Sequence, residues 1–228
     1  RSEVASFKTA DTLPRCIKID HIPNVRDTGG YRVKGGRIRQ GLLYRGGEFE
    51  LHMQLSDKGS RELLRLGVRT ELDMRGEARG QVDFTTAEAI GIARIYVPNE
   101  PYENVFDPKH AEQLHRFFEV LTERASYPVY FHCWGGADRV GTFAFVIGAA
   151  LGMRYEDLID EYEFTGLSIW GVRSRNYQGF QAFLKSFMDL PGMTLQEKAH
   201  AFLMQYAGIT REQIASIEEI LVEKDGKE

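Results

Sequence analysis

One stretch of the chain restricts the possible folds more than any other. Residues 128–132 (PVYFH) are short, bulky and rich in β-forming side chains, which is typical of a buried parallel strand. Residues 138–151 follow and are apolar on almost every side of a helix, so this helix must pack against other structure. A buried strand that leads directly into a buried helix predicts an α/β layered fold.

The rest of the chain repeats this alternation. Residues 31–39 predict a hairpin that turns at Gly35 and Gly36. The expected strands are residues 42–45, 68–74, 93–98 and 128–132, and the expected helices are residues 56–66, 107–125, 138–151, 155–168, 175–190, 195–206 and 211–223. This order favours a central, mostly parallel sheet flanked by helices, with an extra helical portion at the C-terminal end.

No repeat, low-complexity tract or linker divides the sequence, so we expect a single domain over residues 1–228. In this interpretation residues 1–15 form an N-terminal arm and residues 154–228 are the mainly helical part. Two of the late helices begin with the spacing of a capping box, Thr194 with Glu197 and Thr210 with Gln213.

Composition excludes several classes of function. The 228 residues include 33 acidic and 29 basic side chains, which gives a net charge of −4. This balance argues against a general nucleic-acid-binding protein, which needs an excess of positive charge. The apolar run of residues 140–153 is shorter than the roughly 20 residues that cross a bilayer. The first residue is Arg1 and not Met, so an export signal stays open, and we expect a soluble protein that is either cytoplasmic or exported.

The two cysteines could form at most one disulfide. For Cys16 we expect a small, buried, apolar side chain. Cys133 stands in a different setting, within YFHCWGGADRVGT (residues 130–142), at the turn between the buried strand and the apolar helix. Arg139 follows in the first helical turn. This turn therefore combines a nucleophile with a cation.

Such a turn suits a phosphate monoester, which brings about two negative charges to which an attacking thiolate adds another. Successive N–H groups that run into a helix N-terminus bind anions, and Gly135 and Gly136 let the backbone turn inward. Arg139 offers a planar fork to two phosphate oxygens. The same amides favour the thiolate of Cys133, so the turn predicts nucleophilic catalysis through a cysteinyl-phosphate intermediate.

At this point the sequence resembles a known family. HC-x5-R is typical of the cysteine-dependent tyrosine and dual-specificity phosphatases, and the loop is most similar to HCxxGxDRxG of the bacterial and fungal tyrosine phosphatases. That group also carries an upstream N-x-R-D-x-G-G, present here as NVRDTGG at residues 24–30. Further similar segments are GLLYRGGEF, LSDKG, LGVRTELDMR and GITREQIASIEEIL. The resemblance extends over most of the chain from about residue 20.

The resemblance implies a role for each residue of the loop. Cys133 would be the nucleophile and Arg139 the phosphate clamp. The phosphate-binding cradle would be formed by Trp134, Gly135, Gly136, Ala137, Asp138 and Arg139. Asp138 would be the general acid that protonates the leaving oxygen, or merely an acidic residue at a helix N-terminus. Asp107 is a rival acid, or merely a helix cap.

Three further residues are expected to support the loop. His132 would set the loop by hydrogen bonding rather than act as a base. Asp27 would either brace the loop or form an Asx-type turn before two glycines. Relatives usually carry Thr or Ser directly after the arginine, where this chain has Val140, so Thr142 would have to supply the hydroxyl. We therefore expect slow hydrolysis of the phosphoenzyme.

The sequence thus predicts a phosphoric monoester hydrolase of the protein-tyrosine or dual-specificity type. Its partners would be a phosphorylated protein or a small phosphomonoester, with phosphate as product and inhibitor and no nucleic acid. One alternative is a phosphate-recognition module with little turnover. Another is different anion chemistry, either sulfur transfer or arsenate reduction, the latter with Cys16 as the resolving cysteine. A third is a phosphoinositide or inositol phosphate phosphatase. The last is weakened by Ala137, where many relatives carry Lys.

No metal and no cofactor are expected. His132 and Cys133 form one ligand pair without partner cysteines at zinc spacing, and the chain has no GxxxxGK motif. The segment of residues 170–180 places Arg173, Arg175 and Tyr177 close together. In one interpretation this segment borders the pocket and binds either a phosphorylated aromatic group or a second acidic group of the substrate. In the other it is only the solvent-exposed start of a helix.

Overall fold

The computed structural model describes residues 15–76, 86–169 and 171–225. Its main sheet has six strands within these residues, in the order β1 (Arg15–Cys16), β2 (Arg26–Asp27), β5 (Leu43–Gly46), β8 (Val129–His132), β6 (Thr70–Asp73) and β7 (Ala93–Tyr96). The strands β5, β8, β6 and β7 pair in parallel, and β1 and β2 extend the sheet beside β5 with antiparallel pairing. The prediction of a central, mostly parallel sheet is confirmed.

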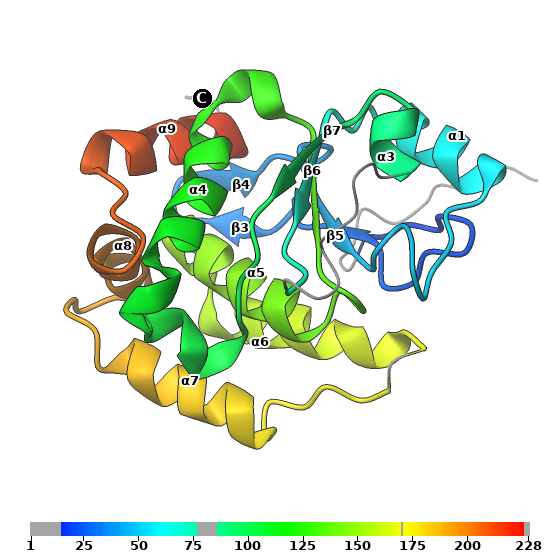
Figure 1. The fold of residues 1–228 in the computed structure, drawn as a ribbon. Coiled ribbons are helices and arrows are strands. Elements are labelled where there is room, and N and C mark those ends of the chain that lie inside the picture. The colour runs from blue at the N-terminus through cyan, green and yellow to red at the C-terminus, as the bar shows by residue number, and fades with distance from the viewer. Residues whose placement is uncertain (1–14, 77–85, 170, 226–228) are drawn as a thin grey trace, which may run out of the picture.

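Helices cover both faces of this sheet (Figure 1). On one face lie α1 (Asp57–Arg65) and α3 (Thr86–Ala89). On the other face lie α4 (Ala111–Thr122), α5 (Asp138–Ala150), α6 (Tyr155–Glu163), α7 (Gln178–Met188), α8 (Leu195–Gln205) and α9 (Arg211–Leu221). Short 3₁₀ turns connect them: η1 (Tyr102–Phe106), η2 (Pro108–His110), η3 (Arg124–Ser126) and η4 (Phe164–Leu167).

The strand β8 shows how the two faces are built. Successive side chains of a strand point to opposite faces of the sheet. Val129 and Phe131 accordingly join the large apolar cluster of α4 to α9, whereas Tyr130 packs with Leu63 of α1 and Ala87 of α3. Most of α5 is buried, from Val140 to the end of the helix, as its all-round apolar sequence predicts. The loop between β8 and α5 is therefore held at both ends by the core.

The helix starts follow the local sequence. Ser56 accepts a hydrogen bond from the backbone N–H of Gly59, and both predicted capping boxes, at Thr194 and Thr210, are confirmed. These caps satisfy N–H groups that have no partner inside their helices. The predicted helix from residue 107 begins differently, because Asp107 and Pro108 open a 3₁₀ turn before α4 starts.

A second sheet was not predicted. It has three strands among the described residues: β3 (Arg32–Val33), β4 (Gly36–Ile38) and β9 (Val222–Lys224). The hairpin of β3 and β4 confirms the turn at Gly35 and Gly36. The predicted helix of residues 211–223 is wrong at its end, because the chain leaves α9 after Leu221 and pairs with β4.

Two other expectations need correction. Cys16 lies on the edge strand β1 and is exposed, so the prediction of a buried Cys16 is wrong. The helix expected from residue 175 begins only at Gln178 as α7. Most of the predicted N-terminal arm, residues 1–15, lies outside the described residues. Among the residues that are described, no helix is both long and apolar enough to cross a membrane.

Candidate active site

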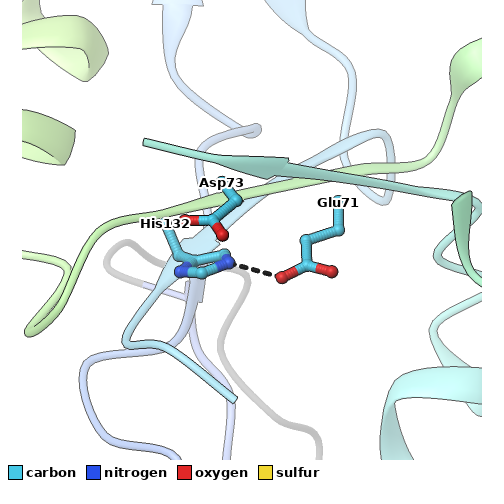
Figure 2. Close-up of side chains that lie close together, drawn as sticks. All are labelled: Glu71, Asp73 and His132. Atoms are coloured by element: carbon cyan, nitrogen blue, oxygen red, sulfur yellow. Dashed lines mark hydrogen bonds and ion pairs between the residues drawn. The ribbon is translucent and has the colours of Figure 1, made fainter. Parts of the chain in front are cut away.

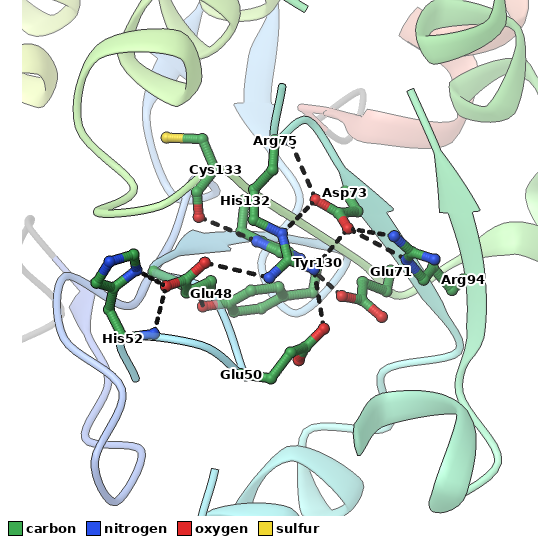
Figure 3. Close-up of polar contacts among 11 residues, drawn as sticks. Glu48, Glu50, His52, Glu71, Asp73, Arg75, Arg94, Tyr130, His132 and Cys133 are labelled. Carbon is green, nitrogen blue, oxygen red and sulfur yellow. Dashed lines mark hydrogen bonds and ion pairs between the residues drawn. The ribbon is translucent and has the colours of Figure 1, made fainter. Parts of the chain in front are cut away.

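The loop of residues 133–137 joins the end of β8 to the start of α5 at Asp138. Its first residue, Cys133, is 4% exposed. Both Cys133 and Cys16 are free thiols. Figure 3 shows the sulfur of Cys133 pointing away from Glu48 and His132, whereas the carbonyl oxygen of Cys133 faces the His132 ring.

The first two carbonyl oxygens of the loop are bound on one side. Nδ1 of His132 donates to the oxygen of Cys133 at 3.1 Å. The backbone N–H of Glu48 donates to the oxygen of Trp134 at 3.0 Å. The predicted role of His132, to set the loop by hydrogen bonding, agrees with this contact.

The next two carbonyl oxygens are bound by side chains on another side. Nδ2 of Asn24 donates to the oxygen of Gly135 at 3.1 Å and to that of Gly136 at 2.8 Å, and Nη2 of Arg45 also donates to Gly136 at 2.8 Å. In a trans peptide the N–H points opposite to the C=O of the same unit. Because four successive carbonyls face outward, the amides of residues 134–137 face the concave side of the loop.

Gly136 is needed for the path of this loop. Its φ of +64° lies in the left-handed region, where glycine is favoured. A Cβ at this position would lie 2.3 Å from the carbonyl oxygen of Gly46 at the end of β5. Only a residue without a side chain fits this close approach.

Behind the loop lies a buried group that we call the basic cluster, consisting of Asn24, Arg26, Arg45 and Glu161. Oε1 of Glu161 accepts from Nε of Arg26 at 2.6 Å, and Oε2 accepts from Nη1 of Arg45. Nη1 of Arg26 donates to Oδ1 of Asn24, which turns the NH₂ group of Asn24 toward the loop. Burial and the charge of Arg26 lower the pKa of Arg45 to about 10, so Arg45 stays a cation at neutral pH.

A second, mostly buried group lies at the ends of β5, β6 and β8 (Figure 3). We call it the acidic cluster, and its members are Glu48, Glu50, Glu71, Asp73, Arg75, Arg94 and His132. Arg75 donates to Glu48 at 3.1 Å, to Glu50 at 2.9 Å and to Asp73 at 2.7 Å. Burial opposes ionisation, but His132 and Arg75 together lower the pKa of Asp73 to about 2.

His132 links the acidic cluster to the loop. Its Nε2 lies 2.7 Å from Oε1 of Glu71, and its Nδ1 contacts the Cys133 carbonyl. Both ring nitrogens thus face acceptors, which requires both to carry protons. Burial disfavours this charge, but the hydrogen bond to Glu71 and the charge of Asp73 raise the pKa of His132 above its ordinary value.

Glu71, Asp73 and His132 also form a group whose ligand atoms lie within 4.8 Å of one another (Figure 2). All three are buried. Asp73 accepts hydrogen bonds from Arg75 and from Arg94, both with N···O distances below 3 Å. Protein cations therefore already occupy the oxygens that a metal would need, and the group behaves as an ion-pair network. The expectation that no metal is required stays a prediction.

Arg139 lies in the first turn of α5. Its Nε donates to the carbonyl oxygen of Asn99 at 2.7 Å, and its Nη2 lies 3.9 Å from Oε2 of Glu100. The side chain is 25% exposed. The segment after β7 thus holds the Nε side of the guanidinium.

The two predicted acids differ in their surroundings. Asp138 accepts hydrogen bonds from Tyr102 and from Arg173, and its side chain is 39% exposed beside the loop. Asp107 accepts from the backbone N–H of Lys109 and pairs with the ammonium of Lys109 at 2.7 Å. The hydrogen bonds from Lys109 lower the pKa of Asp107, as expected of a helix cap. Which of the two aspartates acts as the acid stays a prediction.

Two supporting residues bind elsewhere in the chain. Asp27 accepts from the backbone N–H groups of Gly29 and Gly41 and pairs with Arg15, contacts that fit the turn alternative. Thr142 accepts from the N–H of Tyr102 and donates to the carbonyl of Asp138. Its hydroxyl is therefore engaged away from Cys133 and does not replace the one missing at Val140.

The remaining predicted residues are placed as follows. Trp134 is 36% exposed and its ring lies 4.7 Å from that of His52, whereas Ala137 is 3% exposed. Arg173 binds Asp138, and Arg175 binds Glu163 at 2.7 Å. Both arginines are thus engaged by acids of this chain, which argues against their prediction as receptors for a second acidic group.

Comparison with known proteins identifies the family. Residues 17–223 match the model of the tyrosine phosphatase family. The chain belongs to this family. The match covers the loop, both buried clusters and nearly all helices of the later part of the chain.

Two curated proteins are similar over shorter stretches. "Probable NAD kinase 2, chloroplastic" of Oryza sativa subsp. japonica is 35% identical over 88 residues, which cover 38% of this chain and 9% of that protein. "Putative tyrosine-protein phosphatase H16_A0669" of Cupriavidus necator is 30% identical over 173 residues, which cover 64% of this chain and 61% of that protein. The chain therefore spans less than two thirds of the length of either relative.

Among solved structures, the core catalytic domain of the PP-IP phosphatase SIW14 from S. cerevisiae, in complex with citrate, has a TM-score of 0.46 and 17% identity, and the match covers 86% of this chain and 96% of that one. Tk-PTP in its active form has a TM-score of 0.31 and 15% identity, and the match covers 78% of this chain and 90% of that one.

Sequence reasoning missed several residues that the structure places in the basic cluster or against Asp138, namely Asn24, Arg26, Arg45, Glu161 and Tyr102. A signal existed for the first three, because NVRDTGG and GLLYRGGEF contain them. We attributed the first motif to Asp27 and gave no role to the others. Glu161 lies in an ordinary amphipathic helix and carried no signal.

Proposed function

We propose that this chain hydrolyses phosphoric monoesters on proteins, chiefly phosphotyrosine, through a cysteinyl-phosphate intermediate. One observation carries the proposal: four successive carbonyls of the loop are bound from outside, so that four amides face the side where an anion would meet Cys133. Preorganised amides of this kind stabilise charge that develops in a transition state. Arg139 adds a cation at the same helix N-terminus.

In the first step the sulfur of Cys133 attacks phosphorus and the bond from phosphorus to the leaving oxygen breaks. Asp138 donates a proton to that oxygen and becomes a carboxylate. In the second step water attacks phosphorus, the S–P bond breaks, and the proton of the water passes to Asp138. Inorganic phosphate leaves, and it inhibits because it occupies the same cradle of residues 134–139.

The test is turnover of para-nitrophenyl phosphate by the unmutated protein and by Cys133→Ser. We expect steady hydrolysis by the former and a loss of at least about 10³-fold in the latter, because a serine hydroxyl stays protonated at neutral pH and attacks phosphorus far less readily than a thiolate. Equal rates in the two proteins would overturn the proposal. Cys16→Ser is the matched control, since Cys16 is exposed on the edge strand, and we expect it to be unchanged.

A second candidate is a phosphate-recognition module with little turnover. It is favoured by Val140, which is fully buried where relatives have a hydroxyl, and by the engagement of the Thr142 hydroxyl with Tyr102 and Asp138. Rapid-mixing kinetics distinguish the two candidates. A burst of one nitrophenolate per protein with almost no steady rate supports the module, whereas sustained turnover supports the enzyme.

A further inference from the structure

Asp138 is held by two side chains that come from distant parts of the chain. The hydroxyl of Tyr102 in η1 donates to Oδ1 of Asp138 at 2.5 Å. Arg173, in the segment before α7, donates from Nε to the same Oδ1 at 2.8 Å and from Nη2 to Oδ2 at 3.2 Å. Oδ1 therefore receives two close donors, and Oδ2 receives one longer contact.

Tyr102 adopts a backbone conformation that bulky residues rarely take. Its φ is +58°, in the left-handed region, and the residue is only 9% exposed. Strained conformations of this kind persist where surrounding contacts enforce them, often at functional sites. Here both ends of the residue are tied to the first turn of α5: the backbone N–H donates to Thr142 at 3.0 Å and the hydroxyl donates to Asp138.

The direction of the hydrogen bonds around Tyr102 can be assigned. Burial, followed by the hydrogen bond to Asp138, raises the pKa of Tyr102 far above its ordinary value, so the hydroxyl keeps its proton and donates it. The hydroxyl of Tyr162 lies 2.9 Å from that of Tyr102. Since Tyr102 donates to Asp138, Tyr162 must donate to Tyr102. The chain of donors runs from Tyr162 through Tyr102 to Asp138.

We propose that Tyr102 and Arg173 are positioning residues that direct the acid proton of Asp138 to Oδ2. The inference rests on the proposed function, in which Asp138 protonates the leaving oxygen. Oδ1 already accepts two hydrogen bonds, so a proton on Oδ1 would face two donors. When Asp138 carries the acid proton, Oδ2 is therefore the oxygen that holds it, and the proton moves from Oδ2 to the leaving oxygen as the P–O bond breaks and the S–P bond forms. Loss of either donor lets the carboxyl group rotate and misdirects the proton.

The test compares two esters in each protein. Phenyl phosphate releases a basic phenolate that needs a proton, whereas para-nitrophenyl phosphate releases a stable anion that needs it much less. For Tyr102→Phe and for Arg173→Met we expect kcat/KM on phenyl phosphate to fall about tenfold or more, with kcat/KM on para-nitrophenyl phosphate within about twofold of the unmutated value, because kcat/KM reports the step that breaks the P–O bond. The second ester also reports that each variant is folded.

Tyr177→Phe is the matched control. Its ring contacts that of Tyr102, with centroids 5.4 Å apart, but its side chain is 51% exposed and gives Asp138 no hydrogen bond in the described structure. We expect no preference between the esters in this variant. Equal losses on both esters in Tyr102→Phe, or a selective loss in Tyr177→Phe as large as in Tyr102→Phe, would overturn the inference.

Asp138→Asn separates this inference from the proposed function on which it rests. A selective loss on phenyl phosphate in Asp138→Asn, without one in Tyr102→Phe and Arg173→Met, keeps Asp138 as the acid and overturns the positioning role. No selective loss in Asp138→Asn removes Asp138 as the acid, and the inference with it, while turnover through Cys133 stands. A selective loss in all three variants supports both.

Discussion

The two buried clusters that flank the loop differ in the sign of their charge and in how they reach it. The basic cluster sets two guanidinium groups against the single carboxylate of Glu161 and donates from side chains directly to the loop carbonyls. The acidic cluster sets four carboxylates against two guanidinium groups and the His132 imidazolium. Among the described residues, it reaches the loop through His132 and the backbone N–H of Glu48.

The difference bears on how a chain of net charge −4 can present a positive site to an anion. Buried guanidinium groups of the basic cluster lie against the loop carbonyls, where water screens their charge little, whereas the carboxylates of the acidic cluster are paired with Arg75, Arg94 and His132. The basic cluster should therefore control both the loop and its stability, whereas the acidic cluster should act mainly on stability. The following predictions test that division.

The largest effect is expected from Arg45→Met. It leaves Glu161 with Arg26 as its remaining cation partner and takes one donor from the carbonyl of Gly136. Removing one partner of a buried ion pair costs about 3–5 kcal/mol of the free energy of unfolding. Urea unfolding measures this loss. Arg32→Met is the control, because Arg32 and Asp225 form an exposed pair that should contribute less than about 1 kcal/mol. Similar losses in the two variants would show that the basic cluster has no special role.

A smaller effect on stability but a clear one on activity is expected from Asn24→Ala. It removes the donor that Gly135 and Gly136 share and leaves their carbonyls short of partners. We expect a loss of about 1–3 kcal/mol in unfolding free energy and about 10–100-fold in kcat/KM. Asn104→Ala, at an exposed asparagine, should change neither. Full activity of Asn24→Ala would contradict the claim that outward carbonyls orient the amides.

The smallest effect is the pH dependence that the acidic cluster gives to stability. The pKa of His132 is raised in the folded protein, so the folded state binds the proton more tightly than the unfolded state. Its stabilising contribution is complete below the ordinary pKa of 6.5 and is lost as pH rises through the folded-state pKa. Glu71→Gln should weaken this decline, which cannot exceed about 1.4 kcal/mol per pH unit for one proton. Parallel pH profiles of the two proteins, from urea unfolding, would exclude His132 as the group responsible.

The parts of the fold that depend on local sequence could be predicted. The β8–loop–α5 unit, the capped helices and the β3–β4 hairpin follow from residues close together in the chain. The basic cluster could not be found in this way, because Arg26 and Glu161 are 135 positions apart and no periodicity connects them. Residues 222–224 continue a helical pattern, yet pairing with β4 overrides that local preference.

The same limit explains the errors at the site. NVRDTGG was available to sequence reasoning, and Asp27 attracted attention because an aspartate before two glycines has a familiar turn chemistry. Its neighbour Asn24 contacts the loop and Arg26 contacts Glu161, each more than a hundred positions away, which only the folded chain shows. Tyr102 was missed for the same reason, since its hydroxyl meets Asp138 across 36 positions.

The outward anchoring of residues 133–136 has a thermodynamic consequence. A flexible loop must lose backbone entropy when it wraps around a ligand, and that loss weakens binding. Here folding itself has already restricted the loop, since the carbonyls of Trp134, Gly135 and Gly136 are held by groups distant in the sequence, and that of Cys133 by the neighbouring His132 ring. The loop is therefore preorganised for an oxyanion, and binding should require little rearrangement of its backbone.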